Sequence, residues 1–224
     1  LTVDDGQRAT DQSDPITIAV DEHPPAGQIN VVPQHPLYHG GDTIQFSATA
    51  TDDEDGTLSP SAFSWNIVFH HNTHTHPFMG PLEGVASGSF QMPVLGETSS
   101  NVWYRINLTV TDSAGLKHES FVYVFPQVTQ VTINTSPALP VVILDDQPVS
   151  GPVVFDCVAG ISRPIEVPLM QYYNGKAYLF NSWSDGGGRS HTISTPSTNT
   201  TITAIYEEID QERVSASYYA AGLY

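Results

Sequence analysis

Leu108-Thr109-Val110-Thr111-Asp112, followed by a polar turn and then by Phe121-Val122-Tyr123-Val124, is the stretch that decides the fold class. Its runs of β-branched and aromatic residues on either side of a turn are typical of a β-hairpin. A similar sequence pattern occurs at the start of the chain, where Leu1-Thr2-Val3-Asp4-Asp5 leads to Ile16-Thr17-Ile18-Ala19-Val20. Because an isolated hairpin is only marginally stable in water, we expect residues 1–20 to pair with another sheet.

The rest of the chain contains short strand-like runs between Gly, Pro and Asp turns, such as the alternating run Thr43–Ala50. No segment sustains the 3.6-residue apolar period of a helix. These patterns predict an all-β protein with two tandem Ig-like β-sandwich domains and an orphan N-terminal hairpin. The expected parts are a partial-repeat hairpin at 1–20, a Pro-rich linker at 21–28, a sandwich with a His-rich insertion at 29–126, a second small sandwich at 127–208 and an aromatic tail at 209–224.

Two groups of motifs resemble known extracellular modules. Phe46–Gly56, Phe63-Ser64-Trp65 and Leu108–Asp112 resemble the PKD family of Ig-like domains over residues 27–126, and the His-rich insertion after Trp65 departs from that family. Phe180–Gly187, with Trp-Ser-Asp-Gly at its centre, resembles InlB-repeat-like β-domains. The pair is similar to C-terminal accessory modules of bacterial secreted sugar-dehydrogenase-like or polysaccharide-degrading proteins. These resemblances imply a spacing or binding role outside the cell.

Composition narrows the set of partners. The chain has 7 basic and 24 acidic residues and a formal net charge of −17. Because nucleic acids and anionic membranes attract basic proteins, we expect neither as a partner. No apolar run approaches the length of a membrane span. Charged residues make up only 14% of the chain, against about 25% in a typical soluble domain, a balance common in secreted β-proteins, so an extracellular, secreted or cell-surface protein is expected. Cys157 lies in a strand-like run and is interpreted as a small buried hydrophobe. Three sequons make Asn107, Asn134 and Asn199 candidate glycosylation sites.

Two clusters are candidate metal ligands. The first cluster holds four of the nine histidines, His70, His71, His74 and His76. On one extended strand His70, His74 and His76 would share a face, where imidazoles can chelate a transition metal. The alternative is a polar hairpin in which these rings stack on aromatic neighbours. Asp52, Asp53 and Asp55 are candidate Ca²⁺ ligands because hard cations take carboxylate oxygens; the alternative is a turn that bonds its own backbone.

Five aromatic residues are candidate ligand platforms, because exposed flat rings stack on sugars. They are Trp103 with its neighbour Tyr104, and Tyr172, Tyr173 and Tyr178. Neighbours on a strand face opposite sides, so we expect only one of Trp103 and Tyr104 to be exposed. Packing within a core or on a sheet surface is the alternative role for each. Trp65 alternates with Phe63 and Ile67 and is predicted to lie in a core.

No nucleophile elbow, phosphate loop or metalloprotease motif occurs in the sequence. We therefore expect no enzyme, but a non-catalytic extracellular module that binds a polysaccharide or cell-surface material and spaces other domains. A second hypothesis is a structural subunit that assembles with copies of itself into a fibre, its N-terminal hairpin completing a neighbour's sheet. A third hypothesis is a metal-dependent enzyme module that uses the His cluster.

Overall fold

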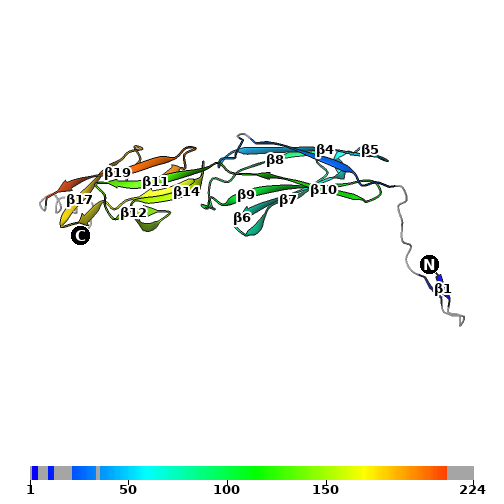
Figure 1. Ribbon diagram of the computed structural model, residues 1–224, viewed down its shortest axis with the longest axis horizontal. Helices are drawn as coiled ribbons and strands as arrows, with labels where there is room; N and C mark the ends of the chain where they lie inside the picture. The colour runs from blue at the N-terminus through cyan, green and yellow to red at the C-terminus, as the bar shows by residue number, and fades with distance from the viewer. Residues whose placement is uncertain (1, 5–9, 13–21, 34–35, 211–224) are drawn as a thin grey trace.

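The computed structural model describes residues 2–4, 10–12, 22–33 and 36–210. In these ranges the protein is all-β, as predicted, with one 3₁₀ turn at Pro60–Ala62 and no α-helix. Figure 1 shows two groups of strands arranged end to end along the long axis of the molecule. We call them the first sheet pair, which precedes Gln127, and the second sheet pair, which follows it.

The first sheet pair consists of two antiparallel sheets. In one sheet, β4 is central and pairs with β3 on one side and with β5 and β8 on the other. The other sheet has the order β10-β9-β6-β7. The bounds are β3 (Ala26–Pro33), β4 (Thr43–Asp52), β5 (Gly56–Thr57), β6 (Phe63–His71), β7 (His74–Glu83), β8 (Ser87–Gln91), β9 (Val102–Thr111) and β10 (Lys117–Val124).

Strict alternation along β4 and β9 builds the first core, because successive side chains of a strand point to opposite faces. Every second residue of β9, from Val102 to Val110, is buried. Trp65 on β6 is fully buried, its ring lies 4.7 Å from that of Phe46 on β4, and its indole N–H donates to the carbonyl oxygen of Val85 at 2.8 Å. The prediction that Trp65 is a core residue is therefore confirmed.

The second sheet pair has a five-stranded sheet, β14-β11-β19-β17-β16, and a four-stranded sheet, β13-β12-β15-β18. β11 and β19 pair in parallel, whereas β11 pairs antiparallel with β14 and β19 pairs antiparallel with β17. Trp183 and the free Cys157 are buried in its core. The bounds are β11 (Val128–Ser136), β12 (Val141–Leu144), β13 (Gln147–Ser150), β14 (Val153–Val158), β15 (Ser162–Glu166), β16 (Met170–Tyr173), β17 (Lys176–Trp183), β18 (Ser190–Ser194) and β19 (Thr200–Ile209).

The two sheet pairs meet through the turn between β14 and β15. Val158 and Ile161 flank this turn and pack into the core of the first sheet pair. The backbone N–H of Gly40 donates to the carbonyl oxygen of Ala159 at 2.7 Å, and that of Ser162 donates to Val94 at 2.8 Å. The junction is therefore a packed and hydrogen-bonded contact.

The N-terminal region differs from the predicted boundaries. β1 (Thr2–Asp4) pairs antiparallel with β2 (Thr10–Gln12), and Figure 1 draws β1 apart from both sheet pairs. The second strand predicted at 16–20 lies outside the described residues, as does the aromatic tail from 211 onward. β3 already begins at Ala26, so the last three residues of the predicted linker belong to a strand.

Candidate ligand-binding face

A row of exposed aromatic rings follows the edge strand β10. Phe121, Tyr123 and Phe125 occupy every second position, so their side chains leave the same face of the sheet. Their exposed fractions are 51%, 42% and 50%, and successive ring centroids lie 5.3 and 5.8 Å apart. Contiguous exposed apolar surface of this kind commonly marks a binding site.

The neighbouring strand β9 extends this row into a two-strand face. Arg105 lies directly opposite Tyr123, and its guanidinium sits 4.0 Å from the ring centroid of Phe121. Trp103, two residues earlier on β9, shares that face and lines a shallow depression of about 480 Å³ with Tyr123 and Phe125. We call Trp103, Arg105, Phe121, Tyr123 and Phe125 the aromatic face.

His70 on β6 completes one side of the aromatic face. Its ring stacks on Trp103 with a centroid distance of 4.9 Å and an interplanar angle of 18°. Burial, followed by the nearby charge of Arg105, lowers the pKa of His70, which favours the neutral form of this imidazole. Its Nε2 atom and the Nε atom of Arg105 are buried and have no hydrogen-bond partner among the described residues. The face therefore combines exposed rings with one imidazole and one guanidinium group.

The predicted platform residues are divided among different places. Tyr104 turns inward, is only 5% exposed and packs against Phe69 and Phe78; its proposed role in an exposed platform is wrong, because strand alternation sends it into the core. Trp103 belongs to the aromatic face. Tyr172 and Tyr173 are exposed on β16 in the second sheet pair, whereas Tyr178 is half-buried against the second core.

Sequence reasoning missed Phe121, Tyr123, Phe125 and Arg105. The available signal was the spacing of three aromatic residues at positions i, i+2 and i+4 in the stretch that indicated a hairpin. The residues between them, Val122 and Val124, face the core. A strand with apolar residues on both faces either lies between two packed layers or exposes one of its apolar faces. In the edge strand β10 the face that carries the aromatic residues is exposed.

The His-rich segment is a hairpin and not one extended strand. The two-residue turn Asn72–Thr73 separates β6 from β7, and the register places His71 opposite His74, with His70 opposite Thr75. Directly opposed residues share a face, so the expectation that His70 lies beside His74 and His76 is wrong. The turn changes the parity of the alternation, and His71 takes that place instead.

The clustered imidazoles are close together but have other partners. Ring centroids are 4.9 Å apart for His71 and His74 and 5.0 Å apart for His74 and His76. Nδ1 of His71 lies 3.2 Å from a carboxylate oxygen of Glu97. Within the described residues, no group of three or more His, Cys, Asp or Glu side chains is placed so that it could hold a metal ion.

The acidic turn after β4 bonds its own backbone. Oδ1 of Asp52 accepts hydrogen bonds from the backbone N–H groups of Glu54 and Asp55 at 3.0 and 2.9 Å. Asp55 turns away and accepts from the backbone and hydroxyl of Ser113, both at 2.8 Å, while Asp53 is exposed. Asp52, Asp53 and Asp55 therefore do not converge as the predicted set of Ca²⁺ ligands.

The three sequon asparagines all make hydrogen bonds within the protein. The Asn107 amide donates to the Asn66 carbonyl oxygen at 3.0 Å, and Asn107 lies on the outward side of β9. The side-chain oxygen of Asn134 accepts from the backbone N–H of Thr135 at 2.8 Å. Asn199 is exposed, and its side-chain oxygen accepts from Gln130. Asn199 is thus the most accessible of the three glycosylation candidates.

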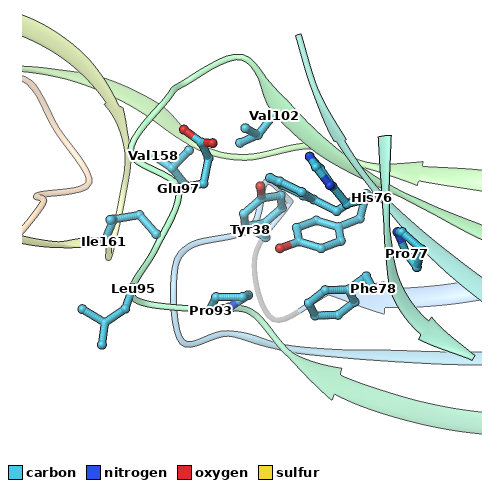
Figure 2. A pocket seen from close by; sticks show the side chains of 12 residues that line it. Tyr38, His76, Pro77, Phe78, Pro93, Leu95, Glu97, Val102, Val158 and Ile161 are labelled. Carbon is cyan, nitrogen blue, oxygen red and sulfur yellow. The ribbon is translucent and has the colours of Figure 1, made fainter. Parts of the chain in front are cut away.

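A cavity of about 190 Å³ lies where the two sheet pairs meet. Figure 2 shows Tyr38 and Phe78 of the first sheet pair on one side of it and Val158 and Ile161 of the second on the other. Ligand sites for small molecules usually measure about 300–1,000 Å³. This cavity is smaller than a typical sugar-binding cleft, so we assign it to the junction and not to ligand binding.

Comparisons with known proteins identify no family. No family model matches the chain, and no curated protein matches it. A solved structure with some similarity is that of Spo0M, a sporulation control protein from Bacillus subtilis, with 9% identity and a TM-score of 0.29 over 87% of this chain and 94% of that one. Among the described residues, no helix is long and apolar enough to cross a membrane.

Proposed function

We propose that this protein is a non-catalytic extracellular module, built from two tandem Ig-like sandwiches of which the first is PKD-like, that binds polysaccharide and spaces neighbouring domains. The observation that carries the proposal is the aromatic face. Sugar rings present C–H groups that stack on aromatic side chains, and the rings of Trp103, Tyr123 and Phe125 line one open depression. Such an open site suits a chain that passes across it.

Polar groups beside the rings support a sugar ligand over a purely apolar one. Arg105 and Asn107 are successive outward residues of β9, next to the rings of β10. Binding sites typically combine apolar walls with a few polar groups that fix the orientation of the ligand. Hydroxyl groups of a glycan can accept hydrogen bonds from the guanidinium of Arg105.

The arrangement of the sheet pairs supports the spacing role. The chain enters the first sheet pair at the end where β5 lies, and β19 runs toward the opposite end of the molecule (Figure 1). The packed turn at Val158–Ile161 joins the two sheet pairs. A module with its connections at opposite ends and a firm junction holds flanking domains apart.

A Tyr123→Ala, Phe125→Ala double variant tests the binding role. Soluble polysaccharides of different linkage would be screened by affinity electrophoresis, and hits would be quantified by calorimetry. We expect the variant to lose at least about tenfold in affinity, or roughly 1.4 kcal/mol. The matched control is Tyr172→Ala, Tyr173→Ala, which removes two exposed rings from the second sheet pair. Equal losses in both variants, or a wild-type protein retained by no polysaccharide, would contradict the proposal.

The edge position of β10 favours a second candidate function, assembly with copies of itself. Among the strands that the structure describes, β10 pairs only with β9 in its sheet, and an edge strand offers a row of main-chain groups to an added strand. A hairpin from residues 1–20 of a neighbouring molecule is the proposed partner. Sedimentation and negative-stain imaging at rising concentration test this candidate. Deletion of residues 1–20 should abolish assembly, and a deleted protein that still assembles would refute it.

A further inference from the structure

Arg105 is the charged residue in the middle of the aromatic face. It lies on the outward side of β9, where the register places Tyr123 of β10 on one side of it and Val68 of β6 on the other. Its side chain is half-buried, and its guanidinium contacts the ring of Phe121, as described above. Because a guanidinium remains protonated at every physiological pH, the face carries a permanent positive charge.

This charge has no acidic partner among the described residues, although the protein has 24 acidic residues. Other basic residues do form ion pairs, which are Arg163 with Asp145, Lys176 with Glu208 and Arg189 with Glu166. The outward positions closest to Arg105 are held by neutral side chains, namely Trp103, Asn107, Phe121, Tyr123, Asn66 and Val68. The sheet therefore leaves this guanidinium without a counter-charge beside it.

Lys117, on the outward row of β10, lies in a different environment. Glu119 occupies the next outward position of the same strand, and side chains two residues apart on a strand share a face. The charge of Lys117 thus has an acidic neighbour. Lys117 is six residues from Tyr123, the strand partner of Arg105, which corresponds to roughly 20 Å at about 3.3 Å per residue. The two cations of this face are therefore independent of each other.

The terminal Nη groups are the donors that Arg105 can offer to a ligand. Its Nε atom is the guanidinium nitrogen that is buried without a partner among the described residues. Contact with the ring of Phe121 uses the charge of the guanidinium and not its N–H groups. These N–H groups form a rigid fork that matches the two oxygens of a carboxylate, and such charge-assisted pairs are about twice as strong as neutral hydrogen bonds. A carboxylate therefore fits this position well.

We propose that Arg105 makes the aromatic face selective for acidic polysaccharides that contain uronic acid residues, an inference that rests on the proposed binding of polysaccharide. A uronic acid carries its carboxylate directly on the sugar ring. Tyr123 lies opposite Arg105, and directly opposite residues of paired strands have Cβ atoms about 4.5–5.5 Å apart. A sugar ring stacked on Tyr123 thus brings its carboxylate to the Nη groups of Arg105.

The charge of the rest of the protein opposes acidic ligands. A net charge of −17 repels a polyanion, and dissolved salt limits this repulsion to about 8 Å at physiological ionic strength. A preference for acidic polymers must therefore come from the local charge of the aromatic face. It should disappear when Arg105 is neutralised.

Affinity electrophoresis and calorimetry with the full chain test this selectivity. The probes are hyaluronan, alginate and polygalacturonate, each compared with its own carboxyl-reduced form, which keeps the linkages and removes the charge. We expect the wild-type protein to bind at least one acidic polymer about tenfold more tightly than its reduced form, or roughly 1.4 kcal/mol. Poly-L-glutamate should bind weakly, because it offers carboxylates without a sugar ring that can stack on the aromatic side chains.

Two variants of Arg105 and one control locate the source of the preference. Arg105→Gln keeps N–H donors but removes the charge, and it should bind the acidic polymer no more tightly than the reduced form. Arg105→Lys should keep only part of the preference, because an ammonium group cannot form the bidentate pair. Lys117→Gln makes an equal charge change on the same face and should keep the wild-type ratio of affinities. Melting temperatures show whether each variant is folded.

Equal binding of the acidic and reduced polymers by the wild-type protein would overturn the selectivity. So would a loss of the ratio in Lys117→Gln as complete as in Arg105→Gln, or binding of poly-L-glutamate as tight as that of the acidic polysaccharide. Reduced polymers that bind the wild-type protein but not the Tyr123→Ala, Phe125→Ala variant would still support the proposed function. A wild-type protein that binds no polymer, charged or neutral, would contradict both. If Arg105→Gln fails to fold, the wild-type comparison and Arg105→Lys decide the question.

Discussion

The backbones of Gly40 and Gly160 touch where the two sheet pairs meet. A Cβ atom added to Gly40 would lie 2.6 Å from the carbonyl oxygen of Gly160, and one added to Gly160 would lie 2.6 Å from the carbonyl oxygen of Gly40. Gly160 also has a φ of +82°, which residues with a side chain rarely adopt. The junction therefore depends on two residues without side chains.

Gly40→Ala should weaken the junction without straining the backbone of Gly40 itself. The added methyl group would push against backbone atoms, which cannot rotate away, and overpacking of this kind costs about 1–3 kcal/mol. We expect a lower midpoint of denaturant unfolding and a wider range of shapes in small-angle scattering. Gly188→Ala is the control, because its Cβ would meet only Ser190 at an ordinary 3.6 Å. A Gly40→Ala protein with wild-type stability and shape would show that the junction adapts freely.

Trp65→Ala and Trp103→Ala should have very different effects on stability. Trp65 is fully buried, and deleting a large core aromatic costs about 3–5 kcal/mol. Trp103 is half-buried on the aromatic face, so its deletion should cost much less and should reduce ligand binding instead. Equilibrium denaturation followed by circular dichroism measures both losses. Similar losses at the two positions would mean that Trp103 is mainly a packing residue and would remove it from the aromatic face.

Strand alternation explains how much of the fold could be predicted from sequence. Trp65 could be assigned to a core because Phe63 and Ile67 share its parity, and the structure buries all three. The same rule required one of Trp103 and Tyr104 to face outward, but it could not say which one. Tyr104 shares its parity with Val102 and Ile106, and these apolar neighbours take it into the core.

The predictions that the structure corrected depend on contacts that the pattern of neighbouring residues in the sequence does not contain. The face of His70 depended on where the chain reverses, and the turn at Asn72–Thr73 follows from hairpin pairing and not from the His spacing. Asp112 was visible as the end of a strand, but the hydrogen bonds that join the next residue, Ser113, to Asp55 depend on how two sheets stack. The aromatic face likewise depends on the pairing of β6, β9 and β10, and a single sequence without homologues does not reveal such contacts between distant residues.

Binding of a transition metal by the His-rich hairpin should follow the observed faces of the strands. Any zinc binding that calorimetry detects should depend on His71, His74 and His76, because these rings are neighbours on one face. His74→Ala, His76→Ala should abolish binding, whereas His70→Ala should not. A wild-type protein that binds no zinc would make the hairpin purely structural, and a loss in His70→Ala would contradict the face assignment.

The contact between His23 and Glu54 should make the linker sensitive to pH. The hydrogen bond and charge of Glu54 raise the pKa of His23 above its ordinary 6.5, and the hydrogen bond with His23 lowers the pKa of Glu54 below its ordinary 4.5. The histidine's contribution is complete below pH 6.5 and is lost as the pH rises through its raised pKa. The glutamate's contribution is present above pH 4.5 and is lost as the pH falls through its lowered pKa. The contact is therefore strongest between pH 4.5 and pH 6.5.

An NMR titration of the His23 ring, with and without Glu54→Gln, measures this effect. We expect the wild-type ring to titrate above 6.5 and the variant to return toward that value, because the variant removes the charge and weakens the hydrogen bond. Asp53→Asn is the control, since its carboxylate lies farther from the ring, at 4.0 Å against 2.8 Å for Glu54, and it should shift the titration less. A His23 ring that titrates at 6.5 in all three proteins would show that the linker does not dock on the acidic turn in solution.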